Sequence, residues 1–212
     1  MKIKEGIKLK GRGVEIPDCS RRHLPEFFKE MGYKVGVEVG VQRGAFSRRL
    51  LKVGLKVYAV DPWLCYPDYD VNIYNDYQAH QDEVYAAAVK NLSIYPNCTI
   101  VRKTSMNAVK DFEDESLDFI YIDGHHGFKY VTEDIYEWSK KIRKGGTISG
   151  HDYSYSILKK NRNQPYVLQV KYVVDAYTKA FNIRDWYVLG RKNKLKEGES
   201  RDQFRSWMWI KK

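Results

Sequence analysis

The fold is decided by the segment Val35-Gly36-Val37-Glu38-Val39-Gly40-Val41-Gln42-Arg43-Gly44, which is typical of a buried strand that ends in a glycine turn and leads into a helix. Gly40 lets the backbone approach a ligand closely at the carboxyl end of the strand, and Gly44 lets the next helix start close against the sheet. Free backbone amides at such a helix start favour an anion or a carboxylate. Farther along, Asp61 ends a second strand, where its carboxylate can accept hydrogen bonds from both hydroxyls of a ribose. The combination predicts a nucleoside-containing cofactor.

The spacing of the two glycines narrows the choice of cofactor. It is Glu-x-Gly-x-x-x-Gly, whereas dinucleotide-binding turns favour Gly-x-Gly-x-x-Gly. A glutamate at the strand end suits a ligand with a positively charged amino acid portion better than one with two phosphates. A nicotinamide-dependent oxidoreductase is therefore a weaker alternative. In the simplest structural interpretation, both glycines are only turn residues and Asp61 is a helix cap.

Outward from this segment, short β-branched runs alternate with helical periodicity, which predicts an α/β fold with a mostly parallel sheet. Helices are expected from Phe46 to Val53, over Phe128 to Ile142 and over Val167 to Phe181. The later strands are expected at 56–60, 99–102, 117–122 and 147–149. The aromatic runs 185–189 and 204–210 have no helix between them, so we expect an antiparallel pair at the end of the sheet.

The domain organisation follows from length and composition. A chain of 212 residues with 43% hydrophobic residues fits one domain, 1–212, with a basic N-terminal extension at 1–32. Residues 64–78 carry neither period and are rich in tyrosine, which predicts a long loop that could act as a lid, although ordinary aromatic packing explains it equally well. The chain has no long apolar run and only 3 cysteines, which favours a soluble, cytoplasmic protein.

Histidines and aspartates follow two of the predicted strands. His125 and His126 stand beside Asp123 after one strand, and the pair His151-Asp152 follows the next. Because the carboxyl ends of neighbouring parallel strands meet at one edge of the sheet, we expect these five side chains to converge. Carboxylate oxygens suit Mg²⁺ or Ca²⁺, and an imidazole widens the choice to Mn²⁺, Fe²⁺ or Zn²⁺.

Four motifs in this order resemble the class I S-adenosylmethionine-dependent methyltransferases over residues 33–190, and most of all the small-molecule O-methyltransferases related to catechol and macrolide-sugar enzymes. The motifs are 37–44 (VEVGVQRG), 60–63 (VDPW), 116–126 (SLDFIYIDGHH) and 145–153 (GGTISGHDY). The resemblance implies a Rossmann-like three-layer sandwich whose sheet has seven strands, the last of them antiparallel.

The resemblance also assigns residues to S-adenosyl-L-methionine. It places Glu38 and Gly40 at the methionine end, Asp61 at the ribose, and Ser105 with Met106 beside the adenine. Trp63 either closes over the site or belongs to the core. The residues assigned to cofactor binding are Glu38, Gly40, Gln42, Gly44, Asp61, Pro62, Trp63, Ser105, Met106 and Asp123.

The same resemblance implies a divalent metal, with Mg²⁺ as one choice, at Asp123, His151 and Asp152, and a base three residues after Asp123, which is His126. Catechol-type members have lysine as that base, and their metal site usually has Asp-Asp or Asp-Asn where this chain has His151-Asp152. The expected catalytic set is His126, His125 and Asp123, with the choice between the two histidines left open. In the alternative without a metal, Asp123 only positions the cofactor and Asp152 caps a loop.

The leading hypothesis is an enzyme that methylates a hydroxyl of a small polar molecule, a sugar or a phenol. The net charge of +10, with seven basic residues between Lys140 and Arg162, leaves RNA or another polyanion as a less favoured acceptor. A third hypothesis is a module that binds the cofactor without catalysis. The aromatic residues of the terminal strand pair leave a homodimer open, and nothing in the sequence indicates a membrane partner.

Overall fold

The computed structural model describes residues 3–65, 78–154, 156–160, 164–191, 196–202 and 204–212, with backbone alone for 156–160 and 164–167. Almost all of the loop predicted at 64–78 lies outside these residues. Within the described part of the chain, no helix is both long enough and apolar enough to cross a membrane.

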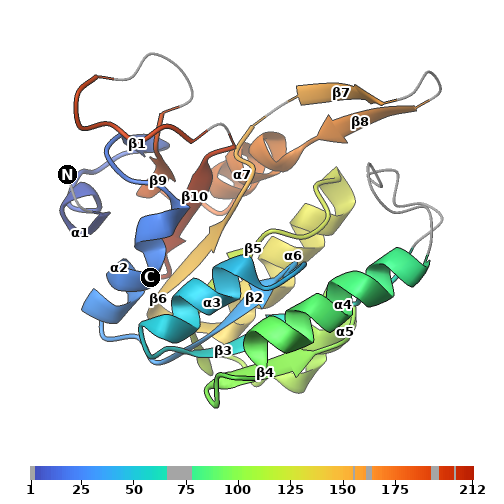
Figure 1. The fold of residues 1–212 in the computed structure, drawn as a ribbon. Helices are drawn as coiled ribbons and strands as arrows, with labels where there is room; N and C mark the ends of the chain where they lie inside the picture. The colour runs from blue at the N-terminus through green and yellow to red at the C-terminus, as the bar shows by residue number, and fades with distance from the viewer. Residues whose placement is uncertain (1–2, 66–77, 155, 161–163, 192–195, 203) are drawn as a thin grey trace.

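The described strands form one eight-stranded sheet in the order β1-β9-β10-β6-β5-β2-β3-β4, together with a separate hairpin (Figure 1). Strands β2 to β6 pair in parallel, β10 runs antiparallel to both β6 and β9, and β1 pairs in parallel with β9. The sheet strands are β1 (Val14–Ile16), β2 (Val35–Val39), β3 (Lys56–Val60), β4 (Cys98–Val101), β5 (Leu117–Ile122), β6 (Ile142–Gly150), β9 (Trp186–Leu189) and β10 (Ser206–Ile210). The hairpin strands are β7 (Ser156–Lys160) and β8 (Gln164–Leu168).

Helices cover both faces of the sheet. One face packs against α2, α3 and α4, and the other packs against α5, α6 and α7. Strand β5 shows the alternation: Phe119 and Tyr121 belong to the first core, while Ile120 and Ile122 belong to the second. The helices are α1 (Ile3–Gly6), η1 (Arg21–His23), α2 (Leu24–Glu30), α3 (Ala45–Lys52), α4 (Gln78–Leu92), α5 (Ser105–Ala108), η2 (Val109–Asp111), α6 (Phe128–Lys141) and α7 (Val170–Ala180).

The predicted α/β sandwich is confirmed, and so is the antiparallel pair at the C-terminal end. Helix α6 buries Val131, Ile135 and Trp138, as the spacing predicts, but it ends at Lys141 because Ile142 already begins β6. The sheet has one strand more than the expected seven. This strand, β1, comes from the N-terminal segment and extends the sheet beyond β9.

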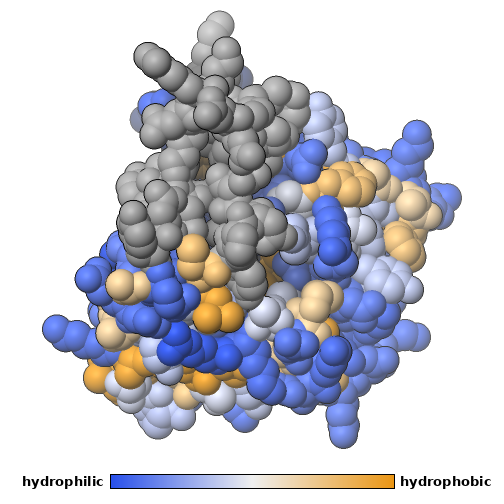
Figure 2. All heavy atoms as spheres, turned by 90° about the vertical axis from the view of Figure 1, so that its right-hand side faces the viewer, coloured by the Kyte–Doolittle hydropathy of each residue, from blue (hydrophilic) through white to orange (hydrophobic). Residues whose placement is uncertain are grey.

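The surface in Figure 2 is mainly hydrophilic, with its apolar side chains in small separate groups. This agrees with a chain in which the large apolar residues sit in two cores, one on each side of the sheet. Of the three cysteines, Cys19 is buried, and Cys65 and Cys98 are partly buried. The edge formed by the carboxyl ends of β2, β3, β5 and β6 carries most of the residues singled out by the sequence.

Candidate active site

The glycine turn after β2 is packed tightly against the end of β5. Gly40 has a φ of +87°, and a Cβ at this position would lie 2.1 Å from the Asp123 carbonyl oxygen. Gly44, the N-cap of α3, has a φ of +79°, and a Cβ there would meet the Leu92 side chain at 2.8 Å. Both positions therefore require glycine, and the pairing of β2 with β5 places Glu38 beside Tyr121, near the end of β5.

Asp61 uses its carboxylate to organise this turn. Its Oδ2 accepts the amides of Val41 at 2.9 Å and Gln42 at 3.0 Å, and its Oδ1 accepts the amide of Trp63 at 2.8 Å. Burial raises the pKa of Asp61 despite these three bonds. The amides that Asp61 occupies belong to the turn and come before α3, which begins at Ala45. A carboxylate has about four acceptor positions, so about one remains for a ribose hydroxyl rather than two.

Glu38 is a buried acid at the end of β2, with an exposed fraction of 2%. It accepts a short hydrogen bond from the Ser47 hydroxyl on α3. Burial raises the pKa of Glu38 to about 8; the Ser47 bond lowers it and the charge of Asp123 raises it further. A buried carboxylate with so high a pKa favours a ligand that brings a positive charge.

The other expected cofactor residues are placed less directly. The Ser105 hydroxyl accepts the Trp138 indole N–H at 2.8 Å and donates to Asp134, while Met106 packs on the second core. Trp63 is 1% exposed, and its indole N–H donates to the Gln42 carbonyl at 2.9 Å, which agrees with the core role. The partly exposed Pro62 links Asp61 to this tryptophan.

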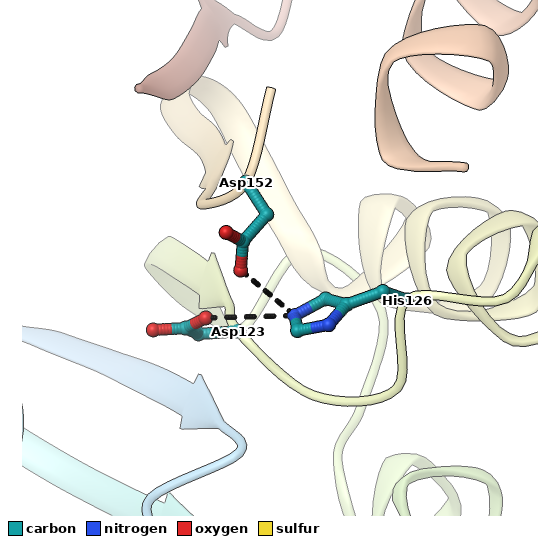
Figure 3. A group of neighbouring side chains, drawn as sticks. All are labelled: Asp123, His126 and Asp152. Atoms are coloured by element: carbon teal, nitrogen blue, oxygen red, sulfur yellow. Dashed lines mark ion pairs between the residues drawn. The ribbon is translucent and has the colours of Figure 1, made fainter. Parts of the chain in front are cut away.

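Four of the five side chains that we expected to converge after β5 and β6 lie close together: Asp123, His126, His151 and Asp152. His126 Nε2 lies 2.8 Å from Asp152 Oδ2 and 3.9 Å from Asp123 Oδ1, and Figure 3 shows the ring directed at both carboxylates. His151 Nδ1 lies 3.3 Å from Asp152 Oδ2 and 3.6 Å from Asp123 Oδ1. Asp123, His126 and Asp152 each offer one ligand atom, and these atoms lie within 4.8 Å of one another. The donor set fits a divalent cation.

Each charged group of this cluster shifts the pKa of its neighbours. Burial alone would lower the pKa of His126, but the hydrogen bonds and charges of Asp123 and Asp152 raise it to about 9. The same two carboxylates outweigh burial at His151 and raise its pKa to about 9 as well. For the carboxyls, burial acts upward and the two imidazoles outweigh it, so that the pKa values of Asp123 and Asp152 are lowered. Both imidazoles are therefore positively charged at neutral pH when no metal ion is bound.

The two adjacent histidines play different roles. His125 Nδ1 accepts the Gly127 amide at 2.9 Å, and its ring packs against the Tyr130 ring in a tilted arrangement, with 4.0 Å between the ring centroids. This turn leaves the next residue, His126, facing Asp123 and Asp152. The geometry thus favours His126 over His125 for proton transfer.

Two residues at the site had no sequence signal. Arg21, from the N-terminal segment, donates to Asp123 Oδ2 at 3.1 Å, and Asp202 Oδ1 lies 3.9 Å from His151 Nε2. Both come from parts of the chain that are far away in sequence. Their only local sign is the Ser20 cap before Arg21, and a cap alone does not indicate a site.

The described basic residues of the 140–162 stretch are largely engaged with acids of this chain. Lys140 pairs with Glu137 at 2.8 Å, Lys141 pairs with Asp114 at 2.7 Å, and the Arg143 guanidinium pairs with Asp118 at 2.6 Å. These pairs reduce the charge available to a polyanion.

Comparison with known proteins gives the family. The sequence profile of a family described as "Methyltransferase domain" matches residues 37–153, more than half of the chain. A protein of Sinorhizobium fredii described as "Uncharacterized protein y4gI" is 28% identical over 96 residues. That match spans 45% of this chain and only 10% of the Sinorhizobium protein.

Solved structures share the fold at low sequence identity. An O-methyltransferase from Bacillus cereus in complex with SAH has a TM-score of 0.58 and 12% identity, covering 90% of this chain and 80% of that one. An rRNA methylase from Streptococcus thermophilus has a TM-score of 0.58 and 15% identity, over 89% of this chain and 95% of that one. A putative caffeoyl-CoA O-methyltransferase from Staphylococcus aureus has a TM-score of 0.57 and 14% identity, over 89% and 81%.

Proposed function

Because this chain belongs to the family of methyltransferase domains, we propose that it transfers the methyl group of S-adenosylmethionine to a hydroxyl group of a small polar molecule, a sugar or a phenol. The observation that carries this proposal is the Asp123, His126 and Asp152 cluster, which lies next to the glycine turn at the carboxyl edge of the sheet. A cluster that can hold a hydroxyl and take its proton, placed beside a cofactor turn, suits O-methylation.

The cofactor part of the proposal rests on Glu38 and Asp61. The buried Glu38 carboxylate suits the ammonium group of the methionine portion, and Asp61 keeps about one acceptor position for a ribose hydroxyl. The fold shared with a Bacillus cereus O-methyltransferase that holds SAH supports this choice. Ser105 and Met106 remain our proposal for the border of the adenine.

We propose that Asp123 and Asp152, with the imidazole of His151, hold a divalent cation such as Mg²⁺, which leaves His126 Nε2 available as the base. Such an ion lowers the pKa of a bound hydroxyl and orients its oxygen. His126 takes the proton of the acceptor hydroxyl at Nε2 as the oxygen–methyl bond forms and the sulfur–methyl bond breaks. For this it must be neutral, and its pKa falls once another cation balances the two carboxylates that raise it.

A small acceptor is favoured over RNA because Lys140, Lys141 and Arg143 are paired with acids of this chain. The fold shared with a Streptococcus thermophilus rRNA methylase, at 15% identity, does not by itself indicate the acceptor.

The test is calorimetry of the protein with SAH and, separately, with NAD⁺. We expect binding of SAH only; binding of NAD⁺ but not SAH would overturn the proposal. A second assay measures SAH release from S-adenosylmethionine with a panel of sugars, phenols and tRNA, with Mg²⁺ or with a chelator. Turnover on tRNA alone would refute the small acceptor, and turnover that the chelator leaves unchanged would refute the metal.

A further inference from the structure

The positively charged guanidinium of Arg21 pairs with one carboxylate oxygen of Asp123, Oδ2. The guanidinium lies 3.1 Å from Asp123 Oδ2, across a sequence separation of 102 residues. The other oxygen, Oδ1, faces the imidazoles at 3.6 Å for His151 and 3.9 Å for His126. One oxygen of the Asp123 carboxylate thus contacts an arginine of the N-terminal segment, and the other faces the candidate metal cluster.

The guanidinium is held on the same face of β5 as its partner. Tyr121 and Asp123 are two residues apart on β5 and its extension, so their side chains share one face of the sheet. The Tyr121 hydroxyl is a further hydrogen-bond partner of Arg21, and it is also paired with the Ser206 hydroxyl at 3.0 Å. Burial alone would lower the pKa of Arg21, but Tyr121, Asp123 and Asp202 outweigh it and raise the pKa.

The backbone that carries Arg21 is itself fixed. Strand β1 pairs with β9, and the Ile16 and Pro17 carbonyls accept the amides of Gly190 at 2.9 Å and Ser200 at 2.8 Å. Ser20 then caps η1 through a reciprocal capping box with His23. Because these contacts come directly before and after Arg21, its side chain starts from a rigid position.

We infer that Arg21 is a positioning residue for Asp123: by fixing Oδ2 it holds Oδ1 toward the cluster of His126, His151 and Asp152, and the N-terminal segment is thereby part of the active site. The physical reason is that the terminal torsion of an aspartate is broad, so a free carboxylate samples many orientations. A charge-assisted hydrogen bond from a rigid partner selects one of them. This inference deepens the proposed function and rests on it for the reaction and the metal.

The test compares Arg21→Gln and Arg21→Lys with Arg22→Gln. Arg22 is the matched control because it is the next residue on the same segment and is exposed. The first measurement is Mn²⁺ affinity, followed by the loss of the electron paramagnetic resonance signal of free Mn²⁺. Residues that orient metal ligands typically contribute about 10- to 100-fold to metal affinity, so we expect a loss of about 10-fold or more in Arg21→Gln. Arg21→Lys keeps the charge without the planar fork and should recover part of it.

A second measurement does not need a metal. The imidazole signals of His126 and His151 in nuclear magnetic resonance spectra of the metal-free protein should move in Arg21→Gln and stay unchanged in Arg22→Gln. SAH affinity and melting temperature report whether the fold and the cofactor side remain intact, and we expect SAH affinity to change less than about threefold.

The outcomes separate the two proposals. Arg21→Gln with wild-type Mn²⁺ affinity and wild-type imidazole signals overturns the role of Arg21. A loss of SAH affinity with unchanged Mn²⁺ binding also overturns it, because Arg21 would then belong to the cofactor pocket. If wild-type protein binds SAH but no Mn²⁺, the metal part of the proposed function fails and the imidazole signals alone decide the role of Arg21.

Discussion

Replacing Glu38 with glutamine should make the ligand-free protein more stable and its cofactor binding weaker. Glutamine has nearly the same shape as a protonated glutamate, and its carbonyl oxygen can still accept the Ser47 hydroxyl. What the change removes is the charge. Since burial is the main cause that raises the pKa of Glu38 to about 8, the charged form is the one that the fold penalises.

The magnitude follows from the pKa. A rise from the ordinary value of 4.5 to about 8 corresponds to roughly 5 kcal/mol at about 1.4 kcal/mol per pH unit. Relaxation of the structure and entry of water reduce such penalties in real proteins. We therefore expect Glu38→Gln to raise the free energy of unfolding at pH 8 by at least about 2 kcal/mol over wild type.

The stability of the wild-type protein should fall with rising pH, because the pKa of Glu38 is higher in the folded chain than in the unfolded chain. Below about pH 4.5 Glu38 is protonated in both the folded and the unfolded chain, and its contribution to stability is fully present. As the pH rises toward 8, the unfolded chain ionises freely while the folded chain resists, so stability is lost across this window.

The assay is urea denaturation of wild type, Glu38→Gln and the control Glu26→Gln, at pH 5 and pH 8. Glu26 is an exposed acid in the first turn of α2. Glu38→Gln should gain stability over wild type at pH 8 and little at pH 5, whereas the control should change little at either pH. In the same variant SAH affinity should fall about 10- to 100-fold, because a hydrogen bond to a charged group contributes roughly 1.5–3 kcal/mol. An equal stability change at both pH values would refute the reasoning.

Three further predictions concern single side chains. His126→Gln should lower methyl transfer at least about 100-fold while SAH affinity changes less than about threefold; equal turnover in an SAH-release assay would eliminate His126 as the base. Asp118→Ala should lower the free energy of unfolding by about 2–4 kcal/mol, because it removes the acceptor for two backbone amides and for the Arg143 guanidinium. These donors outweigh burial and lower the pKa of Asp118, so the difference from wild type in urea denaturation should shrink below about pH 4. Gly40→Ala should lower the melting temperature far more than Gly32→Ala, since both have positive φ but a Cβ at Gly32 meets nothing within 4 Å; similar losses would contradict the close approach to Asp123.

Much of the fold was predictable because central parallel strands are buried on both faces and so form continuous apolar runs. Every residue of β5 is buried, and the spacing of Val131, Ile135 and Trp138 identifies α6. Strand β1 could not be found in this way. It has only three residues, and it pairs with β9 near the other end of the chain. No local period encodes such a contact.

The site was predictable to the level of which side chains meet, since the carboxyl ends of β5 and β6 had to bring Asp123 and Asp152 together. Which imidazole lies between them was not predictable. That choice depends on the turn in which His125 accepts the Gly127 amide and His126 faces the carboxylates. The sequence analysis missed Arg21 for the same reason as β1. The role of Arg21 depends on its contact with Asp123, which is 102 residues away in the sequence.

The number of hydrogen-bond donors around each buried acid distinguishes acids that stabilise the fold from acids that we assign to ligand binding. Asp118, at the start of β5, has two amides and a guanidinium, and its pKa is lowered. Glu38 and Asp134 each have a hydroxyl partner, from Ser47 and Ser105, and burial raises their pKa values to about 8 and about 7. A chain selected only for stability would have apolar residues there, because an acid with so weak a partner destabilises the core. We therefore expect the proposed cofactor to bring a positive charge to Glu38 through its ammonium group.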